Sequence, residues 1–497
     1  MRRNAIAVVA FLVLGPAAWA EQPPGLRFEP HVIRGFDGVE RQAELARLSV
    51  RARRAPPAGD TIDLAVVRLK STATSAGDPI VFLMGGPGIP ASVMAQVPIY
   101  AQLFDRLRAV ADVILLDQRG TGLSRPALDC PVREAPLGAG AFENQSALLA
   151  EMLTEIRPCV ATWRAKAVDP AAYTSGENAA DVADLRGALG ANRVNLLAFS
   201  YGTEVALTVM RRHGAGVARA VLAGVRGPDH ALKLPSVLDL KVRQLAQMAS
   251  ESPGLTAVLR DGSELVTRLE RVLKAAQTPF RVPVTNRQTQ ERVELRVGRE
   301  GLQTVLIQTI DSPRFPALVV TLDQGDTRVL SRVLEPLYNS FSRGGSSLMA
   351  RAINCAMGAS PARVTRAKAE AEWAVLGLPF DDVMISADYC QAVGAAQPDA
   401  VSWRPFASDV PTLFLSGRLD SNTPPSQAEE VRYGFSRGVH LVVENAGHET
   451  LPLAAVQDTV VDFFRGADVG GRRLTSGAIN FLTVEDAANL PCGPRGC

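Results

Sequence analysis

The stretch Val194-Asn195-Leu196-Leu197-Ala198-Phe199-Ser200-Tyr201-Gly202-Thr203 decides the fold. Its first six residues are apolar except for Asn195, which predicts a buried strand, and residues 203–212 have the apolar spacing of a helix. Ser200 stands at the turn between them, with small residues two positions to either side. Such an elbow strains the backbone and exposes the hydroxyl. An ordinary strand-to-helix turn is the alternative, because Ala198 stands where the usual motif has glycine.

Further short apolar runs alternate with helical stretches such as 179–189, the pattern of a mostly parallel sheet. Several runs are apolar at nearly every position, as in strands that are covered on both faces. Residues 21–60 are rich in Pro, Gly and Arg, and we expect irregular structure there. The predicted strands are 62–69, 79–84, 113–117, 194–199, 218–223, 412–416 and 440–443.

The sheet pattern stops near residue 227 and resumes near 411. The intervening chain is mainly helical, as at 238–248 and 263–276, with one hairpin predicted from 280–284 and 293–297. An insertion between two sheet strands would lie over the carboxyl edge, where open α/β sheets bind ligands. The sequence therefore predicts a core of residues 21–227 and 405–497, and a cap of residues 228–404.

A serine hydroxyl needs an oriented base to act as a nucleophile. His448 lies in the loop after the predicted strand 440–443, and Asp420 lies just beyond the strand 412–416. A carboxylate there could hold the imidazole tautomer and stabilise its cation. The order Ser200, Asp420, His448 is that of the α/β-hydrolase fold. Each residue alone could belong to a surface loop; the conjunction predicts a catalytic triad.

Acyl transfer also requires donors to the developing oxyanion. We expect the backbone N–H of Tyr201 to be one donor, and Gly86 in Gly85-Gly86-Pro87-Gly88 to be the other, since Pro87 has no N–H. A plain turn is the alternative for this run. We assign Asp117 and Arg119, after the strand 113–117, a bracing role below the site. This chemistry calls for no metal and no cofactor.

Charge and composition exclude some partners. The chain has 53 basic and 51 acidic side chains, so it lacks the basic excess of a protein that binds a phosphate backbone. Aromatic residues make up only 5%, too few for a platform that stacks nucleic-acid bases. We therefore expect no nucleic-acid partner.

The N-terminus predicts export. Residues 1–4 are basic, residues 5–14 are apolar, and Ala18-Trp19-Ala20 has the small-x-small pattern of a cleavage site. We interpret residues 1–20 as a signal peptide, with an uncleaved anchor as the alternative. The mature protein is then periplasmic or secreted, without stable membrane association.

The six cysteines suit an oxidising compartment. We expect neighbours in sequence to pair, with buried free thiols as the alternative. The candidate pairs are Cys130 with Cys159, Cys355 with Cys390, and Cys492 with Cys497.

Together these motifs resemble the proline iminopeptidase and tripeptidyl aminopeptidase family of α/β-hydrolases, and the resemblance covers nearly the whole mature chain. The part after residue 405 resembles the tripeptidyl aminopeptidase branch. Two positions depart from the pattern: Ala198, and Met84 where relatives often have histidine. The stretches that carry the resemblance are 85–88, 117–124, 200–203, 417–424 and 447–448.

The resemblance implies an exopeptidase that releases residues from the free N-terminus of short peptides through an acyl-enzyme. Such an enzyme needs a carboxylate for the substrate ammonium, since an unpaired buried cation is costly. Glu177, Asp229, Asp239 and Glu449 are candidates, with surface or capping roles as the alternative. A carboxylic-ester hydrolase with the same triad is the second hypothesis, and a ligand-binding protein without activity is the third.

Overall fold

The computed structural model describes residues 25–55, 60–343 and 347–490. The predicted signal peptide, residues 1–20, and the pair Cys492 and Cys497 lie outside these ranges. Within them, no helix combines the length and the apolar character that crossing a membrane requires.

Ten strands form one sheet in the order β1-β2-β3-β5-β4-β6-β7-β10-β11-β12. The three strand pairs at the β1 edge are antiparallel and the other six neighbouring pairs are parallel. The predicted α/β-hydrolase fold with a mostly parallel sheet is confirmed. The strands are β1 (Glu29–Arg34), β2 (Glu40–Arg51), β3 (Thr61–Leu69), β4 (Ile80–Leu83), β5 (Val113–Asp117), β6 (Val194–Phe199), β7 (Val217–Ala223), β10 (Thr412–Gly417), β11 (Gly438–Glu444) and β12 (Leu474–Thr475).

The prediction of irregular structure over residues 21–60 is wrong, because β1 and β2 lie there. In β2, Ala46, Leu48 and Val50 are buried and alternate with exposed polar residues. This is the two-residue period of a strand with one covered face, and the many charged residues between the apolar ones obscured it.

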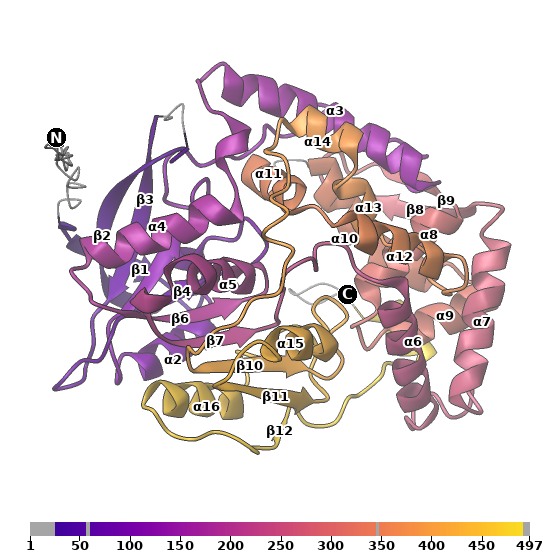
Figure 1. Cartoon of the computed structure of the whole chain (residues 1–497). Helices are drawn as coiled ribbons and strands as arrows, with labels where there is room; N and C mark the ends of the chain where they lie inside the picture. The colour runs from indigo at the N-terminus through magenta and orange to yellow at the C-terminus, as the bar shows by residue number, and fades with distance from the viewer. Residues whose placement is uncertain (1–24, 56–59, 344–346, 491–497) are drawn as a thin grey trace, which may run out of the picture.

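Helices cover both faces of the sheet (Figure 1). On one face α4, α5 and α15 pack against apolar side chains of the sheet, with α15 next to β10 and β11, and on the other face α1, α2 and α16 do so. These helices are α1 (Ala91–Met94), α2 (Pro98–Leu107), α4 (Ser175–Ala188), α5 (Tyr201–His213), α15 (Pro425–Arg432) and α16 (Ala454–Phe464).

A second apolar core lies in a helical region beside the sheet, together with the two-stranded sheet of β8 and β9 (Figure 1). The predicted hairpin corresponds to these two strands. The elements of this core are α6 (Pro235–Ser250), α7 (Gly262–Ala275), β8 (Phe280–Thr285), β9 (Arg292–Val297), α8 (Arg299–Thr309), α9 (Phe315–Asp323) and α10 (Arg328–Arg343). The helices α12 (Pro361–Ala371) and α13 (Asp381–Met384) lie in the same region but outside this core.

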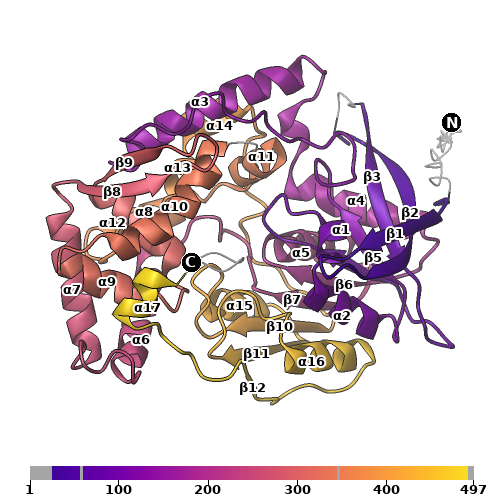
Figure 2. The ribbon, with the colours of Figure 1, turned by 180° about the vertical axis from the view of Figure 1, so that it is seen from behind.

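Packing crosses the predicted cap limits of 228 and 404 in both directions. Phe142 joins the cap core, as does Phe481, and α17 (Val484–Asn489) packs on α9 (Figure 2). Conversely, α11 (Leu348–Met357) and α14 (Ala387–Val393) contribute to the core of the sheet, next to α3 (Gln145–Arg164). The cap is therefore tied to the sheet by segments that precede and follow it in the chain.

Two of the three predicted cysteine pairs form disulfides in the structure. Cys130 is bonded to Cys159 on α3, and Cys355 on α11 is bonded to Cys390 on α14. The second bond joins two helices that pack against each other, and α14 also packs on α3.

Candidate active site

Ser200 forms the elbow between β6 and α5. Its backbone has φ 53° and ψ −124°, a conformation that non-glycine residues rarely adopt. Its N–H donates to the carbonyl oxygen of Ala223 at 2.9 Å, which anchors the elbow to the neighbouring strand β7. The strained turn predicted from the sequence is thus present, and such strain is typical of functional sites.

Two glycines allow the elbow to pack closely against the end of β4. A Cβ at Gly202 would collide with the carbonyl oxygen of Leu83, and a Cβ at Gly85 would lie 2.6 Å from the Cβ of Ser200. By contrast, Ala198 lies fully buried within the apolar core of the sheet. An alanine is therefore accommodated at the position where the usual motif has glycine.

The structure brings Ser200, His448 and Asp420 together. His448 lies in the loop after β11, and its Nε2 is 3.0 Å from Ser200 Oγ. Its Nδ1 is 2.8 Å from Asp420 Oδ2, in the loop after β10. An Nδ1–H that donates to the carboxylate leaves Nε2 free to accept the serine proton. The three residues thus have the geometry of a nucleophile, a base and an orienting acid.

Asp420 is fully buried and fully hydrogen-bonded. The N–H groups of Asn422 and Thr423 each donate to Oδ1 at 2.8 Å, and Thr423 Oγ1 donates to Oδ2 at 2.6 Å. Burial raises the pKa of Asp420, but His448 and Thr423 outweigh it, so that the pKa lies below its ordinary value. The carboxyl group therefore stays ionised beside the imidazole.

The same pairing acts on His448. Burial lowers the pKa of the imidazole, but the adjacent Asp420 carboxylate more than offsets this, with smaller contributions from Asp311 and Glu449, so that the pKa is raised above 6.5. A raised pKa strengthens the base that takes the serine proton.

Asp311 is a second acidic side chain close to Asp420. It follows α8 in the cap, and the N–H of Ser421 donates to its Oδ1 at 3.2 Å. Burial and the neighbouring Asp420 raise the pKa of the Asp311 carboxyl group. Lys241 on α6 interacts electrostatically with Asp311 and Asp420, and burial lowers the pKa of its ammonium group to about 8. No feature of the sequence pointed to either residue.

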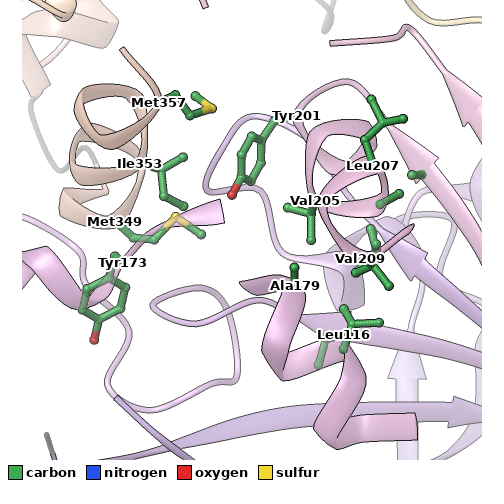
Figure 3. Close-up of a cluster of buried hydrophobic side chains, with 14 of the residues drawn as sticks. Leu116, Tyr173, Ala179, Tyr201, Val205, Leu207, Val209, Met349, Ile353 and Met357 are labelled. Atoms are coloured by element: carbon green, nitrogen blue, oxygen red, sulfur yellow. The ribbon is translucent and has the colours of Figure 1, made fainter. Parts of the chain in front are cut away.

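Tyr201, one predicted oxyanion donor, is the first residue of α5, where backbone N–H groups have no partner within the helix. Its ring is fully buried and points toward α11, close to Met349 and Ile353 (Figure 3). Asn178 Nδ2 donates to its hydroxyl at 3.1 Å. Gly86, the other predicted donor, lines the same cavity as Ser200. The oxyanion role of both residues stays a prediction.

A cavity of about 200 Å³ opens at Ser200 between the sheet edge and the cap. Sequence reasoning missed most of its polar wall. Arg226 follows β7 by three residues, the kind of position that singled out Asp420, whereas the cap residues gave no comparable signal. The cavity is lined by Gly86, Ser200, Arg226, His230, Ala231, Lys233, Gln308, Asn354, Asp381, Met384, Ile385, Asn422 and Thr423.

The acids predicted for a substrate ammonium do not line this cavity. Glu177 pairs with Arg54 at 2.6 Å, and Asp239 pairs with Arg243 at 3.0 Å. Asp229 accepts hydrogen bonds from Ser360 at the start of α12.

Glu449, the fourth candidate, is exposed next to His448 in the chain. Asp381 is the one carboxylate among the described residues that line the cavity. Its Oδ2 accepts a hydrogen bond from Lys233 Nζ at 2.9 Å.

Asp117 and Arg119 make the contacts of bracing residues. Asp117 accepts hydrogen bonds from the N–H and Oγ of Ser92 and from the N–H of Leu123, at 2.7–2.9 Å. Arg119 is fully buried and binds both oxygens of Asp181, at 2.7 and 2.8 Å. These bonds fix the loop after β5.

Comparison with solved structures finds matches of low sequence identity and low TM-score. A meta-cleavage product hydrolase from Pseudomonas fluorescens is 14% identical, with a TM-score of 0.37, and the match covers 82% of this chain and 96% of that one. A proline iminopeptidase-related protein from Thermus thermophilus is 18% identical, with a TM-score of 0.35, over 84% of this chain and 95% of that one.

Two family descriptions match the sequence: the alpha/beta hydrolase fold over residues 78–262, and the TAP-like protein family over residues 378–473. Together with the sheet order, the first defines the class of protein: this is an α/β-hydrolase. The second places it more closely, as an α/β-hydrolase related to the tripeptidyl aminopeptidase family.

Curated relatives match over shorter stretches. A putative hydrolase, YuaR of Escherichia coli, is 28% identical over 33% of this chain and 31% of its own length. The serine protease Hip1 of Mycobacterium tuberculosis is 27% identical over 35% of this chain and 34% of its own length. The match thus spans about a third of each relative.

Proposed function

We propose that the protein is an exported serine aminopeptidase that cleaves short peptides through an acyl-enzyme. One observation carries the proposal: the continuous contact from Asp420 through His448 to Ser200, at 2.8 and 3.0 Å, at the mouth of a small cavity. The match to the TAP-like family favours peptides as substrates. The two disulfides and the predicted signal peptide support export.

In this mechanism His448 Nε2 takes the Ser200 proton while Oγ attacks the scissile carbonyl carbon. The oxyanion accepts hydrogen bonds from the N–H groups of Tyr201 and Gly86. His448 then gives its proton to the leaving amine, and a water molecule repeats the cycle to release the acyl group. Asp420 holds the imidazole and stabilises its cation.

Recognition of a free N-terminus requires a carboxylate within reach of Ser200. Asp381 is our candidate, because it is the acidic side chain of the described cavity wall. Lys233 occupies its Oδ2, which leaves Oδ1 to accept a hydrogen bond from the substrate ammonium.

One observation favours a second candidate, a carboxylic-ester hydrolase. Since Lys233 already neutralises Asp381, the cavity holds no surplus negative charge for an ammonium group. An ester substrate without an ammonium group needs no negative charge in the cavity.

Peptidyl-amide reporters with free and with acetylated N-termini separate the two candidates. We expect the mature protein to cleave the free form only. Turnover of a simple ester with neither peptide cleaved would instead establish the esterase. In both cases Ser200→Ala should lower kcat by more than about 10⁴-fold. Substantial residual activity would refute the assignment of the nucleophile.

A further inference from the structure

The wall of the Ser200 cavity carries more positive than negative charge. Arg226 and Lys233 both line it, with Asp381 as the one acid of the described lining. Lys233 and Asp381 satisfy each other at 2.9 Å. Arg226 is therefore the cation that the cavity itself leaves without a counter-ion.

Glu204 neutralises Arg226 only weakly. Among the described residues, the ion pair of the guanidinium is with Glu204, whose Oε2 is 3.7 Å from Nε, beyond hydrogen-bond distance. Burial raises the pKa of Glu204, and its Oε1 already accepts a hydrogen bond from Ser175. The side chain of Arg226 is only 15% exposed, and its guanidinium donates no hydrogen bond to another described residue. A guanidinium in this position is suited to an anionic ligand.

The position of Arg226 is coupled to the nucleophile. Its backbone N–H donates to Thr203 Oγ1 at 2.8 Å, and Thr203 Oγ1 lies 2.6 Å from the carbonyl oxygen of Ser200. One threonine therefore contacts both residues. These bonds hold the backbone of Arg226 at a fixed place relative to the elbow at Ser200.

We propose that Arg226 binds a carboxylate of the substrate. The inference rests on the proposed function and narrows it to short, carboxylate-bearing substrates. A cavity of about 200 Å³ is smaller than typical ligand pockets of roughly 300–1,000 Å³, so a carboxylate that reaches Arg226 lies close to the scissile bond. The carboxylate is the C-terminus of a short peptide or an acidic side chain beside the cleaved bond.

Competition for Ser200 tests this without requiring peptide cleavage. The wild-type protein is labelled with a fluorophosphonate reagent in the presence of dialanine, dialanine amide, alanyl-glutamyl amide or alanyl-glutaminyl amide. We expect a carboxylate to protect at about tenfold lower concentration than its matched amide, equivalent to about 1.4 kcal/mol. A difference in the first pair assigns the C-terminal carboxylate, and one in the second pair assigns the side chain.

In Arg226→Gln the acid and the amide of the responding pair should protect Ser200 at about the same concentration. Arg226→Lys should retain part of the preference for the acid, because a lysine keeps the charge without the planar fork of the guanidinium. Arg193→Gln is the matched control, since Arg193 is exposed beside the opposite end of β6. Equal protection by acid and amide in both wild-type pairs would overturn the proposal. A preference that survives in Arg226→Gln would do the same. If peptides are never cleaved but the acid protects, the aminopeptidase proposal fails and the carboxylate site stands.

Discussion

At the scale of single residues, the pKa of the base His448 depends on nearby carboxylates, chiefly Asp420 and, less strongly, Asp311 and Glu449. Asp420 contacts the imidazole directly, whereas Asp311 binds the N–H of Ser421 and acts on the imidazole through its charge. Both negative charges raise the pKa of His448 against the effect of burial. Since a general base works in its neutral form, kcat/KM should fall as the pH drops through this raised pKa, beginning above the ordinary 6.5.

Asp311→Asn removes one of these charges while keeping the shape of the side chain. The pKa of His448 should decrease, and the acid limb of the kcat/KM profile should move to lower pH. A pH series with any turned-over reporter measures it. Asp326→Asn is the control, because that carboxylate pairs with Arg328 on the surface of the cap. If the acid limb of the kcat/KM profile stays in place or moves to higher pH, Asp311 does not raise the pKa of His448.

The candidate site could be predicted from the sequence where the sheet determines position. Ser200, Asp420 and His448 each follow a strand that is recognisable from its apolar run, and parallel strands end at the same edge. Asp381 and Asn354 reach the cavity from cap helices. No periodicity relates the number of a cap residue to a place above the sheet, so their proximity to Ser200 requires the tertiary structure.

At the scale of elements, the contact between α5 and β4 places the nucleophile. Gly202 has no room for a side chain because the carbonyl of Leu83 faces it, whereas a Cβ at Gly187, in the exposed part of α4, would meet nothing within 4 Å. Gly202→Ala should therefore push α5 away from β4, lower the free energy of unfolding by about 1–3 kcal/mol and reduce turnover.

Gly187→Ala is the matched substitution and should raise the free energy of unfolding by about 0.4–1 kcal/mol, with turnover unchanged. Denaturant titration and reporter kinetics on the two variants provide the comparison. Equal stability changes in the two helices would show that the close approach of α5 to β4 does not matter.

Strands that are buried on both faces were predicted well from the sequence. β5 and β6 are buried at every residue, and their apolar runs are unmistakable. The edge strand β1 is exposed at most positions and β2 is covered on one side only, so charged residues interrupt their patterns. Burial on both faces thus made β5 and β6 visible in the sequence, whereas β8 and β9 were visible from their alternating pattern.

At the scale of the whole molecule, the two disulfides should differ in what they stabilise. They close loops of similar length, with sequence separations of 29 and 35, so each should contribute about 3–4 kcal/mol to the free energy of unfolding. Only the bond between Cys355 and Cys390 adjoins the cavity. Both of its sulfur atoms lie within 4 Å of the carbonyl oxygen of Met384, a residue of the cavity wall.

The Cys355→Ala/Cys390→Ala variant should therefore lose stability and also raise KM several-fold, because α11 and α14 are no longer tied together beside the substrate. Cys130→Ala/Cys159→Ala should lose a similar amount of stability with KM unchanged, since α3 contributes no residue to the cavity lining. Melting temperatures and KM, the latter measured well below both transitions, separate the two effects. Parallel changes in KM would mean that the disulfides stabilise the fold alone, and that the cavity wall formed by α11 and α13 is held in place by packing.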